Sequence, residues 1–202
     1  MRGRFISLEG LDGAGKTTHL AFIRQWLETQ GIPYRMTREP GGTPLGETLR
    51  GLLLNESMHA DTELLLMFAA RREHVAAVIE PALAAGEWVV SDRFADASFA
   101  YQGGGRGLSL ARIQAVADFT LEGFAPDLTL LLDVPLAISQ ARLQENRQLD
   151  RFEREAAQFH ERVRAVYLDR AHREPQRIRV LDANRPLADI QTDIARILEA
   201  LR

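Results

Sequence analysis

Short apolar runs alternate along the chain with longer segments in which apolar residues recur every three or four positions. The run PDLTLLLDV is typical of a parallel strand buried on both faces. The short runs predict strands at residues 4–9, 33–38, 87–92, 126–134 and 177–183. The periodic segments predict helices at residues 16–30, 44–54, 61–86, 109–124, 135–147, 152–172 and 186–202. This alternation predicts an α/β fold in which helices cover both faces of a parallel sheet.

Polar and glycine residues set the expected limits of these elements. Asp61 is the expected N-cap of the helix at 61–86, which Gly86 ends, and Ser109 is the expected cap of the helix that follows it. The end of the segment 93–108 contains GGGRG and predicts a loop.

Length and composition narrow the class of protein. The 202 residues, 46% hydrophobic, are enough for one well-buried domain, and no linker divides them, so residues 1–202 are expected to form a single domain. A net charge of −3 gives no general attraction for nucleic acid or an anionic membrane. The absence of cysteine excludes disulfides and thiolate chemistry. The longest apolar run, residues 64–70, is too short to span a bilayer, so a cytoplasmic protein is expected.

Residues 10–17, GLDGAGKT, match the phosphate-binding pattern GxxxxGK[ST] between a predicted strand and a predicted helix. In that setting backbone N–H groups and the helix N-terminus converge on a nucleotide phosphate. Lys16 can reach the β- and γ-phosphates, and the hydroxyl of Thr17 can hold Mg²⁺. The simpler alternative is a glycine turn beside an exposed lysine. The expected ATP-binding residues of this segment are Gly10, Leu11, Asp12, Gly13, Ala14, Gly15, Lys16, Thr17 and Thr18.

Nucleotide binding leaves a kinase, a motor ATPase and a switch GTPase open. The chain has no Asn-Lys-x-Asp motif for reading guanine, and it is short for a motor. A phosphotransferase acting on a small molecule is therefore favoured.

Such an enzyme needs cations for a second anionic substrate. Arg93 follows the strand WVVSD, so Asp92 and Arg93 emerge at the carboxyl edge of the sheet, where open α/β sheets bind ligands. Asp92 can hold hydrated Mg²⁺, and Arg93 can bridge two phosphates. The other candidates are Arg38, Arg50, Arg71 and Arg72, although a solvated surface charge is the favoured interpretation of any one of them taken alone.

The segments FISLEGLDGAGKTT, TREPGGTPLGETLR, ELLLMFAARREHV, VVSDRFADASFAYQGGGRGL, PDLTLLLDV and LDRFERE closely resemble the bacterial thymidylate kinases, in the same order and over most of the chain. These enzymes transfer a phosphate from ATP to dTMP. The resemblance implies the P-loop nucleoside monophosphate kinase fold, with a five-stranded parallel sheet. It also implies Mg²⁺ as cofactor with ATP, and a homodimer that meets through the apolar helix at residues 64–84.

The resemblance also implies roles for single residues. Asp12 faces the deoxyribose or acceptor phosphate, while Arg38, Arg50 and Arg93 clamp the dTMP phosphate. Phe68 stacks on thymine, with core packing as its alternative. Arg71 binds a thymine carbonyl, although Arg72 has equally suitable helical spacing. Ser98 and Gln102 contact the pyrimidine edge, and Tyr101 fills the space that a ribose 2′-hydroxyl needs.

A lid is expected at about residues 142–154. Arg147, Arg151 and Arg154 fall at i, i+4 and i+7, so a helix would place three like charges on one face, where an anion would offset their repulsion. The alternative is a solvated helix with an Arg151–Glu155 ion pair. In the resembling family, enzymes without an arginine in the phosphate loop supply one from the lid, and this chain fits that lid-arginine variety.

Arg151 is the first choice for that role and Arg147 the next, and Arg142 with the turn at 184–186 would hold the adenine. Catalysis is then expected from alignment and charge alone, through Lys16, Arg93, Arg151 and Asp12. Two other functions stay open: a kinase for a different monophosphate and a non-catalytic nucleotide-binding module.

Overall fold

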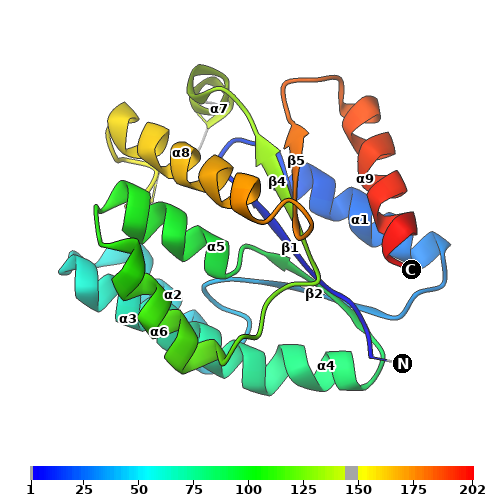
Figure 1. The fold of residues 1–202 in the computed structure, drawn as a ribbon, viewed down its shortest axis with the longest axis horizontal. Helices are drawn as coiled ribbons and strands as arrows, with labels where there is room; N and C mark the ends of the chain where they lie inside the picture. The colour runs from blue at the N-terminus through cyan, green and yellow to red at the C-terminus, as the bar shows by residue number, and fades with distance from the viewer. Residues whose placement is uncertain (1, 144–149) are drawn as a thin grey trace.

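The computed structural model describes residues 2–143 and 150–202, and within them a five-stranded sheet forms the centre of the molecule (Figure 1). All neighbouring strands pair in parallel, in the order β2-β3-β1-β4-β5. The register places Ser7 of the central strand opposite Ser91 and Thr129. The strands are β1 (Phe5–Gly10), β2 (Tyr34–Arg38), β3 (Trp88–Asp92), β4 (Leu128–Asp133) and β5 (Ile178–Asp182). The predicted parallel sheet is confirmed.

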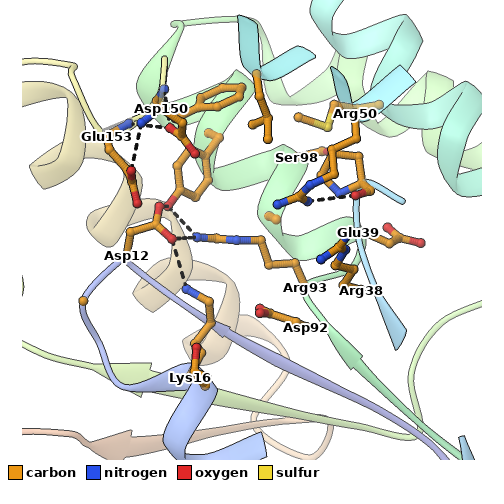
Figure 2. Close-up of a pocket in the computed structure, with 18 of the residues that line it drawn as sticks. Asp12, Lys16, Arg38, Glu39, Arg50, Asp92, Arg93, Ser98, Asp150 and Glu153 are labelled. Atoms are coloured by element: carbon orange, nitrogen blue, oxygen red, sulfur yellow. Dashed lines mark hydrogen bonds and ion pairs between the residues drawn. The ribbon is translucent and has the colours of Figure 1, made fainter. Parts of the chain in front are cut away.

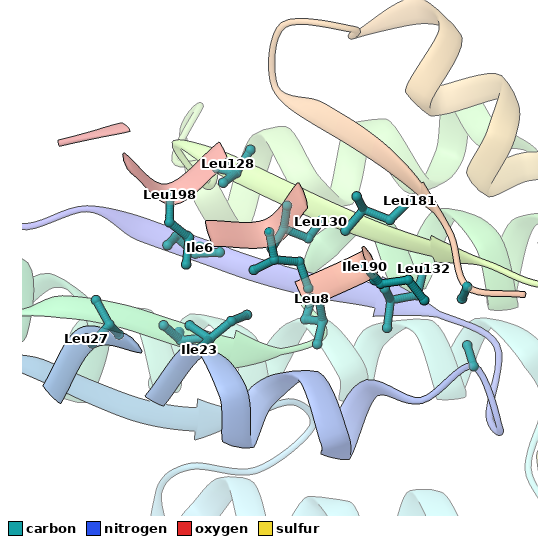
Figure 3. Packing of buried hydrophobic residues seen from close by; sticks show 14 of the residues in the cluster. Ile6, Leu8, Ile23, Leu27, Leu128, Leu130, Leu132, Leu181, Ile190 and Leu198 are labelled. Carbon is teal, nitrogen blue, oxygen red and sulfur yellow. The ribbon is translucent and has the colours of Figure 1, made fainter. Parts of the chain in front are cut away.

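Helices α1 (Lys16–Thr29) and α9 (Leu187–Leu201) cover one face of the sheet (Figure 1). Their apolar sides meet alternate side chains of the strands, as Figure 3 shows for Ile23 and Leu198 beside Ile6. All three are buried completely. This contact seats the phosphate loop firmly, because α1 begins directly after it.

The remaining helices lie on the other face or at the carboxyl edge of the strands. α3 (Ala60–His74) and α6 (Leu110–Leu121) pack with β1 and β3 through a cluster that includes Phe5 and Val89. α8 (Ala157–Arg173) packs Val163 and Tyr167 against Leu131 of β4. The others are α2 (Pro44–Asn55), α4 (Glu80–Ala84), α5 (Ala95–Ser98) and α7 (Leu136–Leu143). Helices on both faces were predicted, and this is also confirmed.

The helix predicted at residues 61–86 differs in its start and its interior. His59, not Asp61, is the N-cap, and its side chain accepts a hydrogen bond from the Asp61 N–H, so the predicted cap is wrong. A π-helical segment, η1 (Val75–Ile79), separates α3 from α4. Hydrophobic spacing alone did not reveal this interruption, because Val75 and Ile79 stay buried.

The loop predicted at the end of the segment 93–108 is only partly correct, because residues Phe99–Gly105 form a second π-helix, η2, and only residues 106–109 before α6 are non-helical. A Cβ on Gly104 would lie 2.6 Å from the backbone oxygen of Arg162, and one on Gly105 would lie 2.4 Å from the ring of Phe159. These glycines therefore let η2 approach α8 closely. This packing brings Tyr101 and Gln102 to the carboxyl edge of the sheet.

Among the described residues, we find no helix whose length and apolar character would let it cross a membrane.

Candidate active site

The phosphate loop joins the carboxyl end of β1 to the first turn of α1 (Figure 2). Gly10, Gly13 and Gly15 have φ values of 142°, 82° and 95°, which favour glycine. A Cβ on Gly13 would also lie 2.3 Å from the backbone oxygen of Ser139 in α7. The backbone of the loop therefore depends on its glycines.

The ammonium group of Lys16 lies inside this loop. Nζ donates to the backbone oxygens of Gly10 and Leu11 at 3.3 and 3.2 Å, and to Oδ1 of Asp12 at 3.3 Å. Burial and the charge of Arg93 lower the pKa of Lys16, whereas Asp12 opposes the shift. The loop itself thus holds the ammonium where a lysine of this motif reaches nucleotide phosphates.

Asp12, Arg93 and Tyr101 form one hydrogen-bonded group beside the loop. Figure 2 shows the side chains of Asp12 and Arg93 pointing toward one another. Nη2 of Arg93 lies 2.7 Å from Oδ1 of Asp12 and 3.0 Å from Oη of Tyr101, which donates to Oδ2 of Asp12 at 3.1 Å. Burial alone would raise the pKa of Asp12, but the charges of Arg93 and Lys16 hold it far below its usual range. Asp12 is therefore a carboxylate that positions both cations.

The backbone of Arg93 has a φ of 74°, unusual for a residue with a side chain. Its N–H donates to Leu8 of β1 at 3.0 Å, and the next N–H, of Phe94, donates to Oε1 of Glu9 at 2.7 Å. Tyr167 donates to Oε2 of Glu9 at 2.7 Å and accepts from Nη1 of Arg93 at 3.2 Å. Glu9 therefore holds both the backbone turn and, through Tyr167, the side chain of Arg93.

Burial, together with the charge of Asp96, raises the pKa of Glu9 to about 8.

Asp92 and Thr17 both line the cavity beside Lys16. Oδ1 of Asp92 is buried and has no hydrogen-bond partner among the residues that the structure describes. In the ranges 2–143 and 150–202, no group of three or more His, Asp or Glu side chains is arranged to hold a metal ion. A carboxylate and a hydroxyl at this place fit a hard cation that takes its other ligands from water and phosphates.

A cavity of about 550 Å³ opens between the phosphate loop, the carboxyl ends of β2 and β3, and the turn at residues 150–153. Most predicted residues converge on it. Its lining includes Asp12, Gly13, Gly15, Lys16, Thr17, Thr18, Arg38, Arg50, Arg71, Asp92, Arg93, Ser98, Tyr101, Gln102 and Arg142. One cavity thus joins the predicted donor site to the predicted acceptor site.

Arg38 and Arg50 approach the cavity from β2 and α2. Nη2 of Arg38 lies 2.9 Å from Oε2 of Glu47, and Nη1 of Arg50 donates to the backbone oxygen of Pro40 at 2.9 Å. Pro40 follows a cis peptide bond after Glu39. Neither contact uses all the donors of its guanidinium, so both arginines retain N–H groups for an anion.

The structure separates the two arginines that helical spacing left equivalent. Arg71 lines the cavity, with Nη1 3.0 Å from Oγ of Ser98 and Nε 2.6 Å from Oε2 of Glu39. Arg72 is exposed on the outer side of α3, where it faces Glu80. Phe68 is 1% exposed in the core beneath the guanidinium of Arg71 and is not a lining residue of the cavity.

Arg142 joins the phosphate loop to the turn after β5. Its Nη2 donates to the backbone oxygen of Ala183 at 3.3 Å, and its Nη1 lies 3.5 Å from that of Gly13. This is the region where the sequence places the adenine. Arg147 lies outside the described residues.

The expected helical face with Arg151 and Arg154 is wrong, because residues 151–154 form a turn and α8 begins at Ala157. The Asp150 carboxylate accepts from the N–H groups of Phe152 and Glu153, both at 2.9 Å, while Oε2 of Glu153 accepts from the Asp150 N–H at 2.9 Å. This reciprocal capping stabilises one short turn.

Glu63, which is completely buried in α3, joins this turn to the acceptor side of the cavity. Its Oε2 accepts from Nη2 of Arg151 at 2.6 Å and from Nε of Arg106 at 3.2 Å. Its Oε1 accepts from Nε2 of Gln102 at 2.8 Å. Arg151 also donates to the backbone oxygen of Leu53 at 3.0 Å, so in this conformation its guanidinium is bound to α2 and α3.

Sequence reasoning missed Glu9, Glu63 and Tyr167. A signal existed for the two glutamates, because each is a single carboxylate within an apolar run: FISLEG and TELLLMF. A charge buried at such a place needs partners, and partnered buried charges cluster at functional sites. No comparable pattern distinguishes Tyr167.

The sequence is similar to known proteins over almost its whole length. The family model described as thymidylate kinase matches residues 8–194. A thymidylate kinase of Chromobacterium violaceum is 59% identical over 202 residues, covering 99% of this chain and 95% of that protein. One of Thiobacillus denitrificans is 59% identical over 199 residues, covering 98% of each.

A solved structure is similar as well. The crystal structure of a thymidylate kinase from Ehrlichia chaffeensis has a TM-score of 0.78 and 33% identity, covering 98% of this chain and 99% of that one. The similarity therefore extends over the fold as well as the motifs.

Proposed function

Because the chain belongs to the thymidylate kinase family, we propose that it transfers the γ-phosphoryl group of ATP to dTMP, giving dTDP and ADP for dTTP synthesis. The observation that carries the proposal is the link between Asp12 and Arg93, at 2.7 Å. It joins the phosphate loop to the carboxyl end of β3 within one cavity. An arginine at that junction can touch both the transferred and the accepting phosphate.

On the donor side, we assign the phosphates of ATP to residues 10–18 and the adenine to the region beside Arg142. Support comes from the glycine geometry of the loop and from the contacts of Arg142 with Gly13 and Ala183.

On the acceptor side, we assign the dTMP phosphate to Arg38, Arg50 and Arg93. Arg71 is favoured over Arg72 for the thymine carbonyl, because only Arg71 lines the cavity. Ser98 and Gln102 would meet the same edge of the base, and Tyr101 the sugar. The stacking role of Phe68 stays a prediction. The guanidinium of Arg71 lies over the Phe68 ring, so a thymine could stack there only if Arg71 moved.

Thr17 and Asp92 would hold the magnesium ion that accompanies ATP, and the partnerless Oδ1 of Asp92 supports this choice. Bound there, the ion would neutralise phosphate charge. Lys16 and Arg93 supply positive charge from the protein, and Asp12 orients both. No general base is required, because the accepting phosphate is already ionised.

The lid would supply the last cation. Arg151 and Arg147 keep the roles expected for them, although Arg151 reaches the phosphates only if its 2.6 Å contact with Glu63 opens.

A homodimer through α3 and α6 is part of the proposal. Leu65 on α3 is 57% exposed and Phe119 on α6 is 84% exposed, and both are large apolar side chains on neighbouring helices. Such residues favour an interface. The cytoplasmic location and the single domain with its lid remain predictions.

One assay separates the proposal from its two rivals. The chain is incubated with Mg-ATP and a panel of ribo- and deoxynucleoside monophosphates, and ADP release is measured. Strong preference for dTMP is the expected result. Preference for another monophosphate would support a different kinase, and no ADP with any acceptor would support a binding module.

Lys16→Met is expected to abolish ADP release while circular dichroism and the melting temperature stay near those of the parent, because the lost ammonium acts on the phosphates. Thr29→Ala is the control, because it changes an exposed residue at the far end of the same helix and leaves the phosphate loop intact. Substantial turnover by Lys16→Met would contradict the proposed role of the loop.

A further inference from the structure

The side chain of Gln102 is almost completely buried, and its two polar atoms have different surroundings. Nε2 donates to Oε1 of Glu63 at 2.8 Å. Oε1 of Gln102 is buried too, and within the described part of the chain it has no hydrogen-bond partner. Gln102 lines the cavity beside Ser98 and Arg71. A buried carbonyl without a partner is costly, so this atom calls for a donor from the ligand.

The orientation of this amide follows from the chemistry of Glu63. Two guanidinium groups, of Arg151 and Arg106, contact Glu63, which therefore carries a carboxylate. A carboxylate only accepts hydrogen bonds, so the group that faces it must be the NH₂ of Gln102. The carbonyl oxygen of Gln102 must then face the other way.

We propose that Glu63 is a positioning residue for base selection: it forces Gln102 to present an acceptor, so the site requires a base that offers an N–H donor. The inference rests on the proposed function, because it concerns the acceptor site of that reaction. Thymine has a donor at N3, whereas cytosine has an acceptor there. A cytosine base would leave two acceptors facing each other, which disfavours its binding.

The variant Glu63→Gln reverses this arrangement instead of merely weakening it. Oε2 of Glu63 accepts the two shorter arginine contacts, 2.6 Å from Arg151 and 3.2 Å from Arg106, whereas Arg106 lies 3.4 Å from Oε1. The amide oxygen of the variant therefore takes the position of Oε2. Its NH₂ group then takes the place of Oε1 and faces Gln102. Gln102 must rotate its amide to accept, and it then presents NH₂ to the cavity.

The test compares dTMP with 5-methyl-dCMP, which keeps the methyl group and sugar but reverses the N3 and C4 groups. The readout is the ratio of their kcat/KM values, or of their dissociation constants where turnover of 5-methyl-dCMP is undetectable. Glu63→Gln is expected to lower this ratio by about tenfold, the size of one mismatched buried hydrogen bond. A general loss of folding or activity cancels in the ratio.

Two further variants interpret the result. Gln102→Met removes the amide and is expected to lower the ratio at least as much. Arg151→Met removes a different partner of Glu63 and is expected to leave the ratio within twofold of the parent, whatever it does to kcat.

A Glu63→Gln ratio near that of the parent would overturn the inference, whether or not Gln102→Met changes it. The inference would also be overturned if Arg151→Met lowered the ratio as much as Glu63→Gln does. Loosening of the turn that carries Arg151 would then explain the lower ratio in both variants. A parent chain that releases no ADP with dTMP would overturn the proposed function, and the inference with it.

Discussion

At the scale of single residues, the site holds its own cations in pairs with Asp12. Lys16 and Arg93 contact its carboxylate at 3.3 and 2.7 Å. A bound phosphate would compete with this carboxylate for both cations. Lys16 and Arg93 would then exchange one anionic partner for another, so neither cation is left unpaired in the cavity before the phosphate binds. Such preorganised cations stabilise the charge of a transferring phosphoryl group effectively.

Substitutions of Tyr101 test the proposal that its side chain excludes a ribose 2′-hydroxyl from the acceptor site. Its ring packs against Phe152, at 5.8 Å between centroids, and its hydroxyl contacts Asp12 and Arg93. Tyr101→Ala is expected to narrow the preference for dTMP over the ribonucleotide by about tenfold, mainly by admitting the ribonucleotide. Tyr101→Phe, which keeps the ring, should lower kcat but retain the preference. An unchanged ratio of kcat/KM values in the alanine variant would mean that discrimination lies elsewhere.

The raised pKa of Glu9 predicts how the free energy of unfolding depends on pH. Burial, with Asp96, raises its pKa to about 8, against 4.5 in the unfolded chain. Between these values the folded chain keeps a proton that the unfolded chain has lost, so the free energy of unfolding falls as pH rises. Glu9→Gln removes this titration. The parent should therefore lose stability relative to the variant by about 1 kcal/mol per pH unit from pH 5 to 8.

Urea unfolding of both proteins at pH 5, 6.5 and 8 measures this difference. Parallel pH dependence of the two proteins would contradict the raised pKa. Activity at pH 7 should survive the change, because an amide oxygen can still accept from the Phe94 N–H, 2.7 Å away.

At the scale of elements, periodicity predicted the order of strands and helices, and local motifs predicted the residues at strand ends. Lys16 was found from the GxxxxGK[ST] motif, and Asp92 and Arg93 were found because they lie at the end of a predicted strand. The π-helix at Phe99–Gly105 was missed, because three glycines indicate a turn unless the partner helix that approaches them is known. Glu63 was missed for the same reason: its partners lie about 40 to 90 residues away in the chain.

The turn at residues 150–155 tests the lid arginine. If Arg151 moves to the transferring phosphoryl group, Arg151→Ala should lower kcat by about 10³, or about 4 kcal/mol, with little change in the Kd of dTMP. Glu63→Gln is the control, because it replaces the ion pair of Arg151 with a weaker neutral hydrogen bond and keeps the arginine, so it should cost kcat much less. Equal losses in both variants would mean that Arg151 only anchors the turn.

Arg147→Ala and Arg154→Ala are measured in the same way. If all three alanine variants keep kcat within tenfold of the parent, the positive charge comes from Lys16, Arg93 and the metal ion, and the lid prediction is wrong.

At the scale of the whole molecule, the exposed apolar side chains are unevenly placed. Phe119→Glu and Leu65→Glu are expected to weaken a homodimer by about 2 kcal/mol or more each, because they bury a charge at the interface. Leu187, 48% exposed at the start of α9 on the opposite face of the sheet, provides the control Leu187→Glu. Sedimentation velocity measures the mass of the particle that each variant forms. If Phe119→Glu and Leu65→Glu keep the mass of the parent dimer, the interface lies elsewhere.

The packing of the phosphate loop also limits the routes by which this enzyme can evolve. Leu11 and Ala14 are buried in the core, Gly13 has no room for a side chain beside Ser139, and Asp12 holds the cations of the site. An arginine at any of these four variable positions would therefore disrupt a core, a helix contact or the charge balance. If the catalytic arginine lies in the lid, as proposed, a lineage with this loop cannot move it from the lid to the loop by one substitution. The two arrangements should persist as separate branches, since the first of the compensating changes would be selected against.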